Sequence, residues 1–64
     1  MNIKTAFELS VKTGYSQTSI GTFIAYSGLP IAESFQMIIE FKRSGIQSLS
    51  DVNKIVLLGY FKHD

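Results

Sequence analysis

The sequence predicts an all-α fold, a compact bundle of four short helices built as a single domain over residues 1–64. Glycines divide the chain at positions where helices commonly end, because glycine enters the left-handed conformation of a helix C-cap cheaply. These helix-ending glycines are Gly14, Gly28 and Gly45. Between them the apolar residues recur at helical spacing, and no segment alternates apolar with polar residues as a half-buried strand does. The β-branched pairs at 38–39 and 55–56 favour strands locally, but both lie between helix-capping residues.

The first helix is expected from about Thr5 to Thr13. Thr5 and Glu8 have the spacing of a capping box, in which two residues satisfy backbone N–H groups at the start of a helix. Gly14 then ends the segment. Apolar residues on one side of this helix form its predicted buried stripe: Ile3, Ala6, Phe7 and Val11.

The second helix is predicted to begin at Ser16, whose hydroxyl can cap it, and to end at Gly28. Tyr15 and Ile20 have the spacing of a hydrophobic staple across this cap. The expected apolar positions are Ile20, Phe23, Ile24 and Tyr26. Leu29 lies where a Schellman ending would pack it on Ile24.

The third helix is expected from Pro30 to about Ser44. Proline suits the first helical position, where its missing N–H costs nothing. Gly45 ends the helix, and Ile46 is then placed to pack on Phe41. Polar residues line up on one side at helical spacing, which predicts a solvated stripe of Glu33, Gln36, Glu40 and Arg43.

Ser48 and Asp51 form a second candidate capping box, which predicts that the fourth helix starts at Ser48. Its apolar residues are Val52, Ile55, Val56, Leu57, Leu58, Tyr60 and Phe61. The third and fourth helices are therefore apolar around most of their surface, with only a narrow polar side. A chain this short buries only about 60% of the surface that its unfolded form exposes. The two helices therefore carry more apolar surface than the chain can bury by itself, and this apolar surplus predicts that a partner covers part of them.

Composition limits the classes of function. The chain has no cysteine, so it forms no disulfide and no thiolate metal site. Its net charge of +1 neither demands nor forbids nucleic acid or an anionic membrane as a partner. The sequence shows no signal peptide, no run approaching a membrane span of about 18 apolar residues, and no helix that combines an apolar face with a lysine-rich one. We therefore expect a cytoplasmic protein that does not act on membranes.

No group of residues predicts an active site. The single histidine, His63, lies next to the end of the sequence, where a basic residue suits a helix C-terminus. Glu33 and Glu40 share a helix face, but an acid–base pair or a cation site would need further groups. The glycines are scattered rather than gathered in a phosphate-binding loop. We expect no enzymatic activity, no cofactor, no metal ion and no small-molecule substrate.

The apolar surplus gives the first hypothesis about function. Leu57 and Phe61 lie on the side of the fourth helix opposite Val56, and only one of these sides can pack on the chain's own core. On the third helix, Met37 and Phe41 form a similar flank. Methionine and aromatic residues are typical anchors of protein interfaces. The sequence thus predicts a small regulatory or inhibitory protein that acts by protein–protein contact through helices three and four, as a homodimer or on another protein.

Two segments resemble Cro-type helix-turn-helix repressors. Residues 14–21, Gly-Tyr-Ser-Gln-Thr-Ser-Ile-Gly, are similar to the lead-in of the helix-turn-helix in that family. Residues 45–52 are similar to the family's link into its last helices. In that family a Ser-Gln pair contacts the DNA backbone, which the resemblance places on Ser16 and Gln17.

The spacing departs from the pattern of that family. If Gly21 takes the small position of the motif, the turn glycine should fall at position 25, which is Ala25. If Gly28 is instead the turn glycine, the small position falls on Ile24, which is bulky. The third helix, as a recognition helix, would also carry two carboxylates, and these repel phosphate.

The alternative function is therefore a helix-turn-helix transcriptional regulator that dimerises through the fourth helix. Under this hypothesis the residues nearest the DNA are Ser16, Gln17, Thr18, Gln36, Lys42 and Arg43. The cations also have a purely structural explanation, because Lys12, Lys42 and Arg43 lie in the last turns of predicted helices and complement the helix dipoles. A small chain of this kind suits a mobile element such as a phage or a plasmid.

Overall fold

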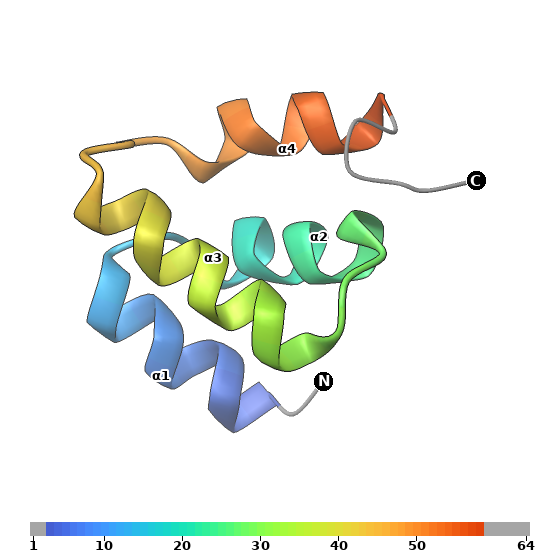
Figure 1. The fold of residues 1–64 in the computed structure, drawn as a ribbon. Helices are drawn as coiled ribbons and strands as arrows, with labels where there is room; N and C mark the ends of the chain where they lie inside the picture. Colours follow the sequence, from blue (N-terminus) through green and yellow to red (C-terminus); the bar gives the residue numbers. More distant parts are fainter. Residues whose placement is uncertain (1–2, 59–64) are drawn as a thin grey trace.

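The structure is a computed structural model that describes residues 3–58 (Figure 1). Within that range it contains no strand, and its helices are α1 (Ile3–Thr13), α2 (Gln17–Ser27), α3 (Ile31–Arg43) and α4 (Leu49–Leu57). The all-α fold and the four helices predicted from the sequence are therefore confirmed.

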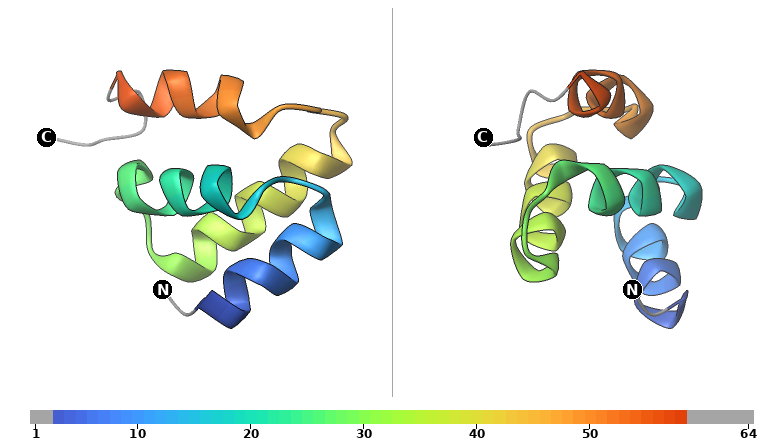
Figure 2. Two further views of the ribbon diagram at one scale, coloured as in Figure 1. Left: turned by 180° about the vertical axis from the view of Figure 1, so that it is seen from behind. Right: turned by 90° about the vertical axis from the view of Figure 1, so that its right-hand side faces the viewer.

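The helices form two pairs that cross each other (Figures 1 and 2). α1 and α3 lie side by side and run in the same general direction, and α4 runs along α2 in the same way. α2 is the centre of the fold, because it contacts α1, α3 and α4. α4 packs almost entirely on α2.

The core is built around α2. Ile20 and Phe23 are fully buried, and the ring of Phe23 meets the ring of Phe41 in α3 edge-on at a centroid distance of 5.6 Å. This edge-to-face arrangement is the one that aromatic quadrupoles favour. The other core residues that pack around them are Leu9, Tyr15, Ile38, Leu49 and Val56. All four helices therefore share one core, and α2 occupies its middle.

The C-terminal ends of the helices use the residues expected from the sequence. Positive φ angles occur at the predicted helix-ending glycines, Gly14 (83°), Gly28 (74°) and Gly45 (90°). The end of α3 is a Schellman motif, in which the Ile46 N–H donates to the Phe41 carbonyl and the Gly45 N–H donates to the Lys42 carbonyl. Both bonds satisfy carbonyls that an unfinished helix would leave unpaired.

The N-terminal ends differ from the prediction at three helices. α1 begins earlier than expected, so Thr5 lies in its first turn and is not its cap. Pro30 is the N-cap residue of α3, with an extended ψ of 148°, and is not its first helical residue. Ser48 is at the N-cap of α4 as expected, but its side chain makes no capping hydrogen bond. Asp51 pairs with Lys54 at 3.5 Å instead of completing a capping box.

The predicted stripe of α1 is not its buried side. Phe7 and Val11 are 54% and 70% exposed. The buried residues of this helix are Ala6, Leu9 and Thr13. Thr13 can face the core because its hydroxyl donates a hydrogen bond to the Leu9 carbonyl of the same helix at 2.8 Å. Its polar group is therefore buried with a hydrogen-bond partner. The side chain of Ile3 lies outside the described part of the structure.

Candidate nucleic-acid interface

α1 and α2 form a helix-turn-helix arrangement. Residues 14–16 connect them, and the Gly14 N–H closes the end of α1 by donating to the Ser10 carbonyl at 2.7 Å. Because Gly14 is left-handed, the chain turns sharply here, and α2 lies across α1 instead of folding back along it (Figure 2). A short glycine-containing turn between two crossing helices is the arrangement by which many proteins place a helix in the DNA major groove.

This turn lies earlier in the chain than either position considered from the sequence. Ala25 is inside α2, and Gly28 begins the connection to α3. The Ser-Gln pair therefore opens the second helix of the arrangement, with Ser16 as the N-cap and Gln17 as the first helical residue. Gly28 and Pro30 both lie beyond the end of α2 and are not part of the helix that the Ser-Gln pair opens.

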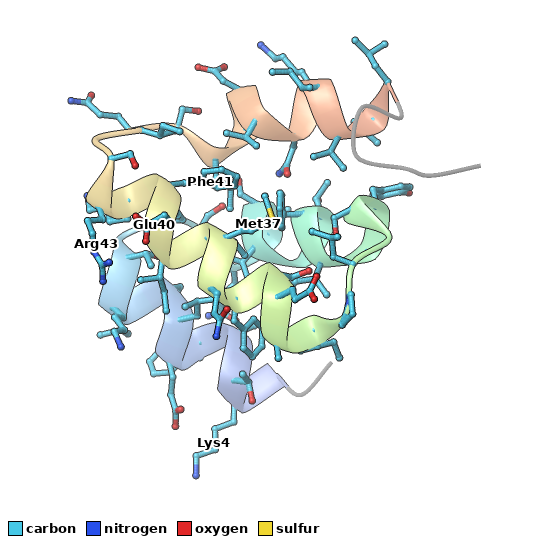
Figure 3. All side chains as sticks on the ribbon, in the orientation of Figure 1. Lys4, Met37, Glu40, Phe41 and Arg43 are labelled. Atoms are coloured by element: carbon cyan, nitrogen blue, oxygen red, sulfur yellow. The ribbon has the colours of Figure 1, made fainter. Side chains whose placement is uncertain are left out.

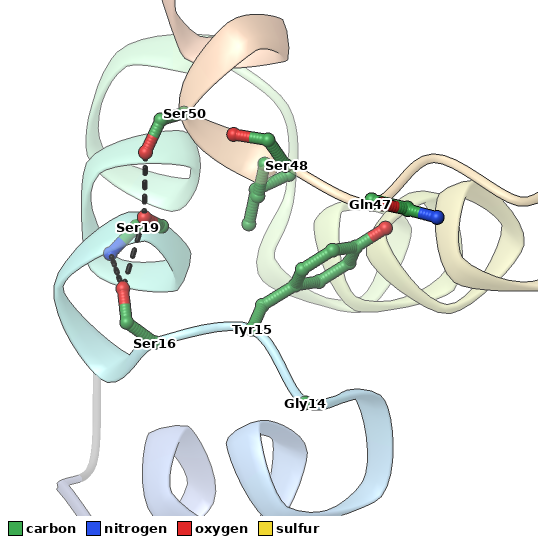
Figure 4. A pocket seen from close by; sticks show the side chains of 8 residues that line it. Gly14, Tyr15, Ser16, Ser19, Gln47, Ser48 and Ser50 are labelled. Atoms are coloured by element: carbon green, nitrogen blue, oxygen red, sulfur yellow. Dashed lines mark hydrogen bonds between the residues drawn. The ribbon is translucent and has the colours of Figure 1, made fainter.

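Serine hydroxyls fix the start of α2 (Figure 4). The Ser16 Oγ accepts a hydrogen bond from the Ser19 N–H at 3.1 Å and donates one to the Ser19 Oγ at 2.9 Å. The Ser19 Oγ is in turn 3.2 Å from the Ser50 Oγ of α4. On α4, the Asn53 Nδ2 donates to the Ser19 carbonyl at 2.9 Å. The position of α2 is therefore set by bonds that do not involve its outward side chains.

The N-termini of α2 and α4 open on a common hollow of about 210 Å³ (Figure 4). Its lining residues are Gly14, Tyr15, Ser16, Ser19, Gln47, Ser48, Leu49 and Ser50. The Tyr15 hydroxyl donates to the Ile46 carbonyl, and burial raises the pKa of Tyr15. This bond holds the α3–α4 connection over the turn between α1 and α2. The first backbone N–H groups of both helices, with their partial positive charge, are therefore at the same end of the protein.

The outward side of α2 is polar and uncharged. Residues 17–27 contain no Lys, Arg, Asp, Glu or His. Gln17, Thr18 and Ala25 are exposed, and Thr22 is half-buried. Thr18, Thr22 and Ala25 are spaced to share one side of the helix. Within residues 3–58, the side chains of Gln17, Thr18 and Thr22 have no hydrogen-bond partner, so they are available to a ligand.

Cations lie in the last turns of α1 and α3, and carboxylates lie beside them: Lys12 and Glu8 line one hollow between these helices. Lys12 lies in the last turn of α1, and Lys42 and Arg43 lie in the last turn of α3. The Tyr15 bond brings the segment that follows α3 against the segment that follows α1, so these helix ends are neighbours. Arg43, labelled in Figure 3, pairs with Glu40 at 3.2 Å. Both partners are exposed, and such pairs are weak enough for a phosphate to displace the carboxylate.

Gln36 does not join this group. It lies on the exposed side of α3 together with Glu33 and Glu40, as the predicted solvated stripe requires. These three residues and Met37 line a separate shallow hollow of about 350 Å³. Two carboxylates make this side of α3 unfavourable for phosphate.

The structure places the residues of the predicted protein interface in different environments. Met37 and Phe41 are half-buried and pack against the core, on the side of α3 that faces α2 and α4 (Figure 3). Both side chains are therefore partly used by the chain's own core, and Met37 also lines the shallow hollow on α3. Leu57 is exposed while its neighbour Val56 is buried, as expected for opposite sides of α4. Phe61 lies outside the described residues.

The outward side of α4 carries exposed apolar residues interspersed with the charged pair Asp51 and Lys54. The apolar residues are Ile55, Leu57 and Leu58, which are 44%, 58% and 85% exposed, and we call them the α4 outer face. The buried residues of this helix are Leu49, Asn53 and Val56. Of the predicted interface residues that the structure describes, Leu57 alone belongs to the α4 outer face.

The sequence did not point to Lys12, Thr22 and Ala25 as candidate interface residues, because the motif was expected one helix later. The signal that could have found them is local. Only three residues separate Thr13 from Gln17, and the first of them is a glycine. Among the described helices, α2 alone has no charged residue.

Within residues 3–58 no cluster of His, Cys, Asp and Glu residues could hold a metal ion. None of the helices in that range has the length and apolar character needed to cross a membrane. Comparisons with protein families, with curated proteins and with solved structures found no match. The function must therefore be inferred from the geometry and chemistry of the interface itself.

Proposed function

We propose that the protein binds double-stranded DNA through the α1–α2 helix-turn-helix and acts as a small transcriptional regulator. In this proposal α2 enters the major groove. One observation carries it: a glycine turn at residues 14–16 sets α2 across α1 and leaves the polar side chains of Gln17, Thr18 and Thr22 unpartnered within the described chain. DNA-binding helices of this type contact base edges with their N-terminal residues, and Gln17 and Thr18 occupy those positions.

The charges near the start of α2 support a phosphate contact. Lys12, Lys42 and Arg43 can each reach toward a backbone phosphate from the ends of α1 and α3. The N-termini of α2 and α4 add partial positive charge at the same end. Because the net charge of the whole chain is only +1, this attraction is local, and the affinity should depend strongly on orientation and on salt.

α2 fits the groove better than α3 does. The outward side of α3 carries Glu33 and Glu40, which would face the phosphates. The outward side of α2 carries no charge of either sign. A neutral polar helix flanked by cations can approach base edges without desolvating a carboxylate.

Titration of a fluorescein-labelled random-sequence duplex, followed by fluorescence anisotropy at low and moderate salt, tests the proposal. We expect binding that weakens steeply as salt rises. Lys42→Glu combined with Arg43→Glu should abolish the binding and leave the helical circular dichroism spectrum unchanged, because both side chains are exposed. A folded wild-type protein that binds no duplex at low salt would contradict the proposal.

A matched pair of single variants locates the interface. Lys12→Glu reverses a charge beside the α1–α2 turn, and Lys4→Glu makes the same change at the other end of α1 (Figure 3). We expect a much larger loss of DNA affinity from Lys12→Glu. Equal losses from the two variants would indicate general electrostatic attraction and would count against the α1–α2 interface.

A second candidate function concerns the α4 outer face. We propose that it pairs with the α4 outer face of a second copy in an antiparallel arrangement. Asp51 and Lys54 lie about one turn apart on the exposed side of α4, so antiparallel pairing sets each residue opposite the other one in the second copy. Dimers of helix-turn-helix proteins present two recognition helices to successive turns of the duplex.

Light scattering at low micromolar concentration tests the self-association. We expect a dimer for the wild type and a folded monomer for Leu57→Glu combined with Leu58→Glu, because charged residues cannot be buried unpaired in an apolar contact. A control variant, Phe7→Glu, alters an exposed apolar residue of α1 and should remain dimeric. A monomeric wild type would contradict the pairing and would favour a different protein as the partner of this face.

A further inference from the structure

The side chains on the outward face of α2 determine which bases it can recognise. This face carries Gln17, Thr18, Thr22 and Ala25. Arginine and lysine, whose donors pair with the N7 and O6 of guanine, are absent from residues 17–27. Aspartate and glutamate, which accept from the amino group of cytosine, are also absent from that helix. The face therefore has none of the charged groups that recognise a G·C pair.

Gln17 has the chemistry and the position to recognise adenine. Its amide offers one acceptor and two donors, which match the N6 amino group and the N7 acceptor of adenine in the major groove. As the first residue of α2, Gln17 is at the end of the helix that meets the bases. The hydroxyls of Ser16 and Ser19 on either side of it are already bonded to each other, which leaves the Gln17 amide and the Thr18 hydroxyl as unpartnered polar side chains at this end within the described residues.

The rest of the face matches thymine. Thr18, Thr22 and Ala25 each carry a methyl group on one side of α2. Thymine is the base with a methyl group in the major groove, and alanine and threonine methyls make apolar contact with it. An adenine contact at the start of the helix and methyl contacts along it both require A·T pairs.

We infer that α2 selects A·T base pairs in the major groove, with Gln17 on adenine and Thr18, Thr22 and Ala25 against thymine methyl groups. This inference rests on the proposed DNA-binding function and specifies the class of sequence that the protein recognises.

Selection of duplexes from a pool with a randomised central segment, using the full chain at low salt, tests the inference first. We expect enrichment of a motif whose core pairs are A·T.

Replacing one contacted thymine by deoxyuracil removes a single methyl group and should lower the affinity about fourfold. Replacing one contacted adenine by 7-deazaadenine removes the N7 acceptor and should lower it about tenfold. Both replacements change the major groove and leave the minor-groove edge of the pair intact.

Two glutamine variants provide the matched comparison. Gln17→Ala should lower the affinity for the selected duplex about tenfold and should abolish the effect of 7-deazaadenine. Gln36→Ala removes the same side chain from the carboxylate-bearing side of α3 and should change neither quantity. If Gln17→Ala lowers affinity but the 7-deazaadenine penalty persists in it, the assignment of adenine to Gln17 is wrong.

The outcomes separate this inference from the proposed function. Enrichment of a G·C motif, or tight binding with no base preference, would overturn the inference and leave DNA binding intact. Failure of the folded wild type to bind any duplex of the pool at low salt would overturn both. An A·T motif that is insensitive to deoxyuracil and to 7-deazaadenine would indicate recognition of the minor groove or of DNA shape, and it would also overturn the inference.

Discussion

α2 and α4 run side by side, begin at the same hollow and each have a serine at the N-cap, yet they are stabilised differently. α2 contacts three helices, buries Ile20 and Phe23 completely and exposes uncharged polar side chains. α4 packs almost entirely on α2, and its outward side carries the apolar α4 outer face together with the charged pair Asp51 and Lys54. The exposed side of the central helix is thus uncharged, and that of the peripheral helix combines apolar residues with charges.

This difference indicates how each helix meets other molecules. α2 is held in place by its buried residues and by the hydrogen bonds of Ser16 and Ser19. Its outward side chains take no part in these contacts. Those side chains suit recognition of a polar ligand. The α4 outer face has no partner within the described chain, and exposed apolar surface of this kind is stabilised when a second molecule covers it.

The largest expected effect comes from the core residue of α2. Phe23→Ala removes a fully buried ring that packs edge-on against Phe41, and such truncations cost about 3–5 kcal/mol. That loss is comparable to the total stability of about 5 kcal/mol expected of a small domain. Urea denaturation followed by circular dichroism should therefore show little or no folded baseline at 25 °C.

Leu58→Ala is the control for this prediction. It removes an apolar side chain of α4 that is 85% exposed, and its effect should stay within about 0.5 kcal/mol. Comparable losses from Phe23→Ala and Leu58→Ala would show that α2 and α4 do not differ as central and peripheral helices.

Local chemistry made the helix ends predictable, and tertiary packing decided the buried sides. Gly14, Gly28 and Gly45 end helices because few other residues adopt positive φ cheaply, and this depends on no distant contact. Which side of α1 faces inward depends on where α2 and α3 lie. Phe7 is exposed and Thr13 is buried for that reason, although hydrophobicity alone predicts the reverse.

For the candidate interface, the sequence indicated residues but not the helix turn to which they belong. Ser16, Gln17 and Thr18 were singled out from the sequence, and they lie together at the start of α2. Helical spacing predicted that Gln36 shares its side of α3 with two carboxylates, but it did not show that Phe41 packs inward. The packing of Phe41 follows from the angle at which α3 lies on the core, and helical periodicity carries no information about that angle.

Tyr15 connects the two helix pairs and gives the next largest effect. Tyr15→Phe removes the hydrogen bond from its hydroxyl to the Ile46 carbonyl and should cost about 1 kcal/mol at neutral pH, measured by urea denaturation. Burial raises the pKa of Tyr15 in the folded protein above the value of 10.0 in the unfolded chain. The contribution of its hydroxyl is therefore fully present below pH 10 and is lost as the pH rises through the folded-state pKa.

The pH dependence separates this role from simple packing. We expect the stability of the wild type to fall above pH 10 more steeply than that of Tyr15→Phe. Tyr26→Phe, which removes a hydroxyl from the exposed side of α2, should follow the wild type at every pH. An alkaline loss that is identical in wild type and Tyr15→Phe would mean that the Tyr15 hydroxyl does not hold the α3–α4 connection.

The smallest effects compare the two N-cap serines directly. Ser16→Ala removes the Oγ that accepts from the Ser19 N–H and should cost roughly 0.5–1 kcal/mol. Ser48→Ala removes a hydroxyl that makes no capping hydrogen bond, and its cost should be a few tenths of a kcal/mol at most. Urea denaturation of both variants measures the difference. Equal costs would show that the start of α4 is as firmly capped as the start of α2, and the hydroxyl chain through Ser19 would then have no special part in positioning α2.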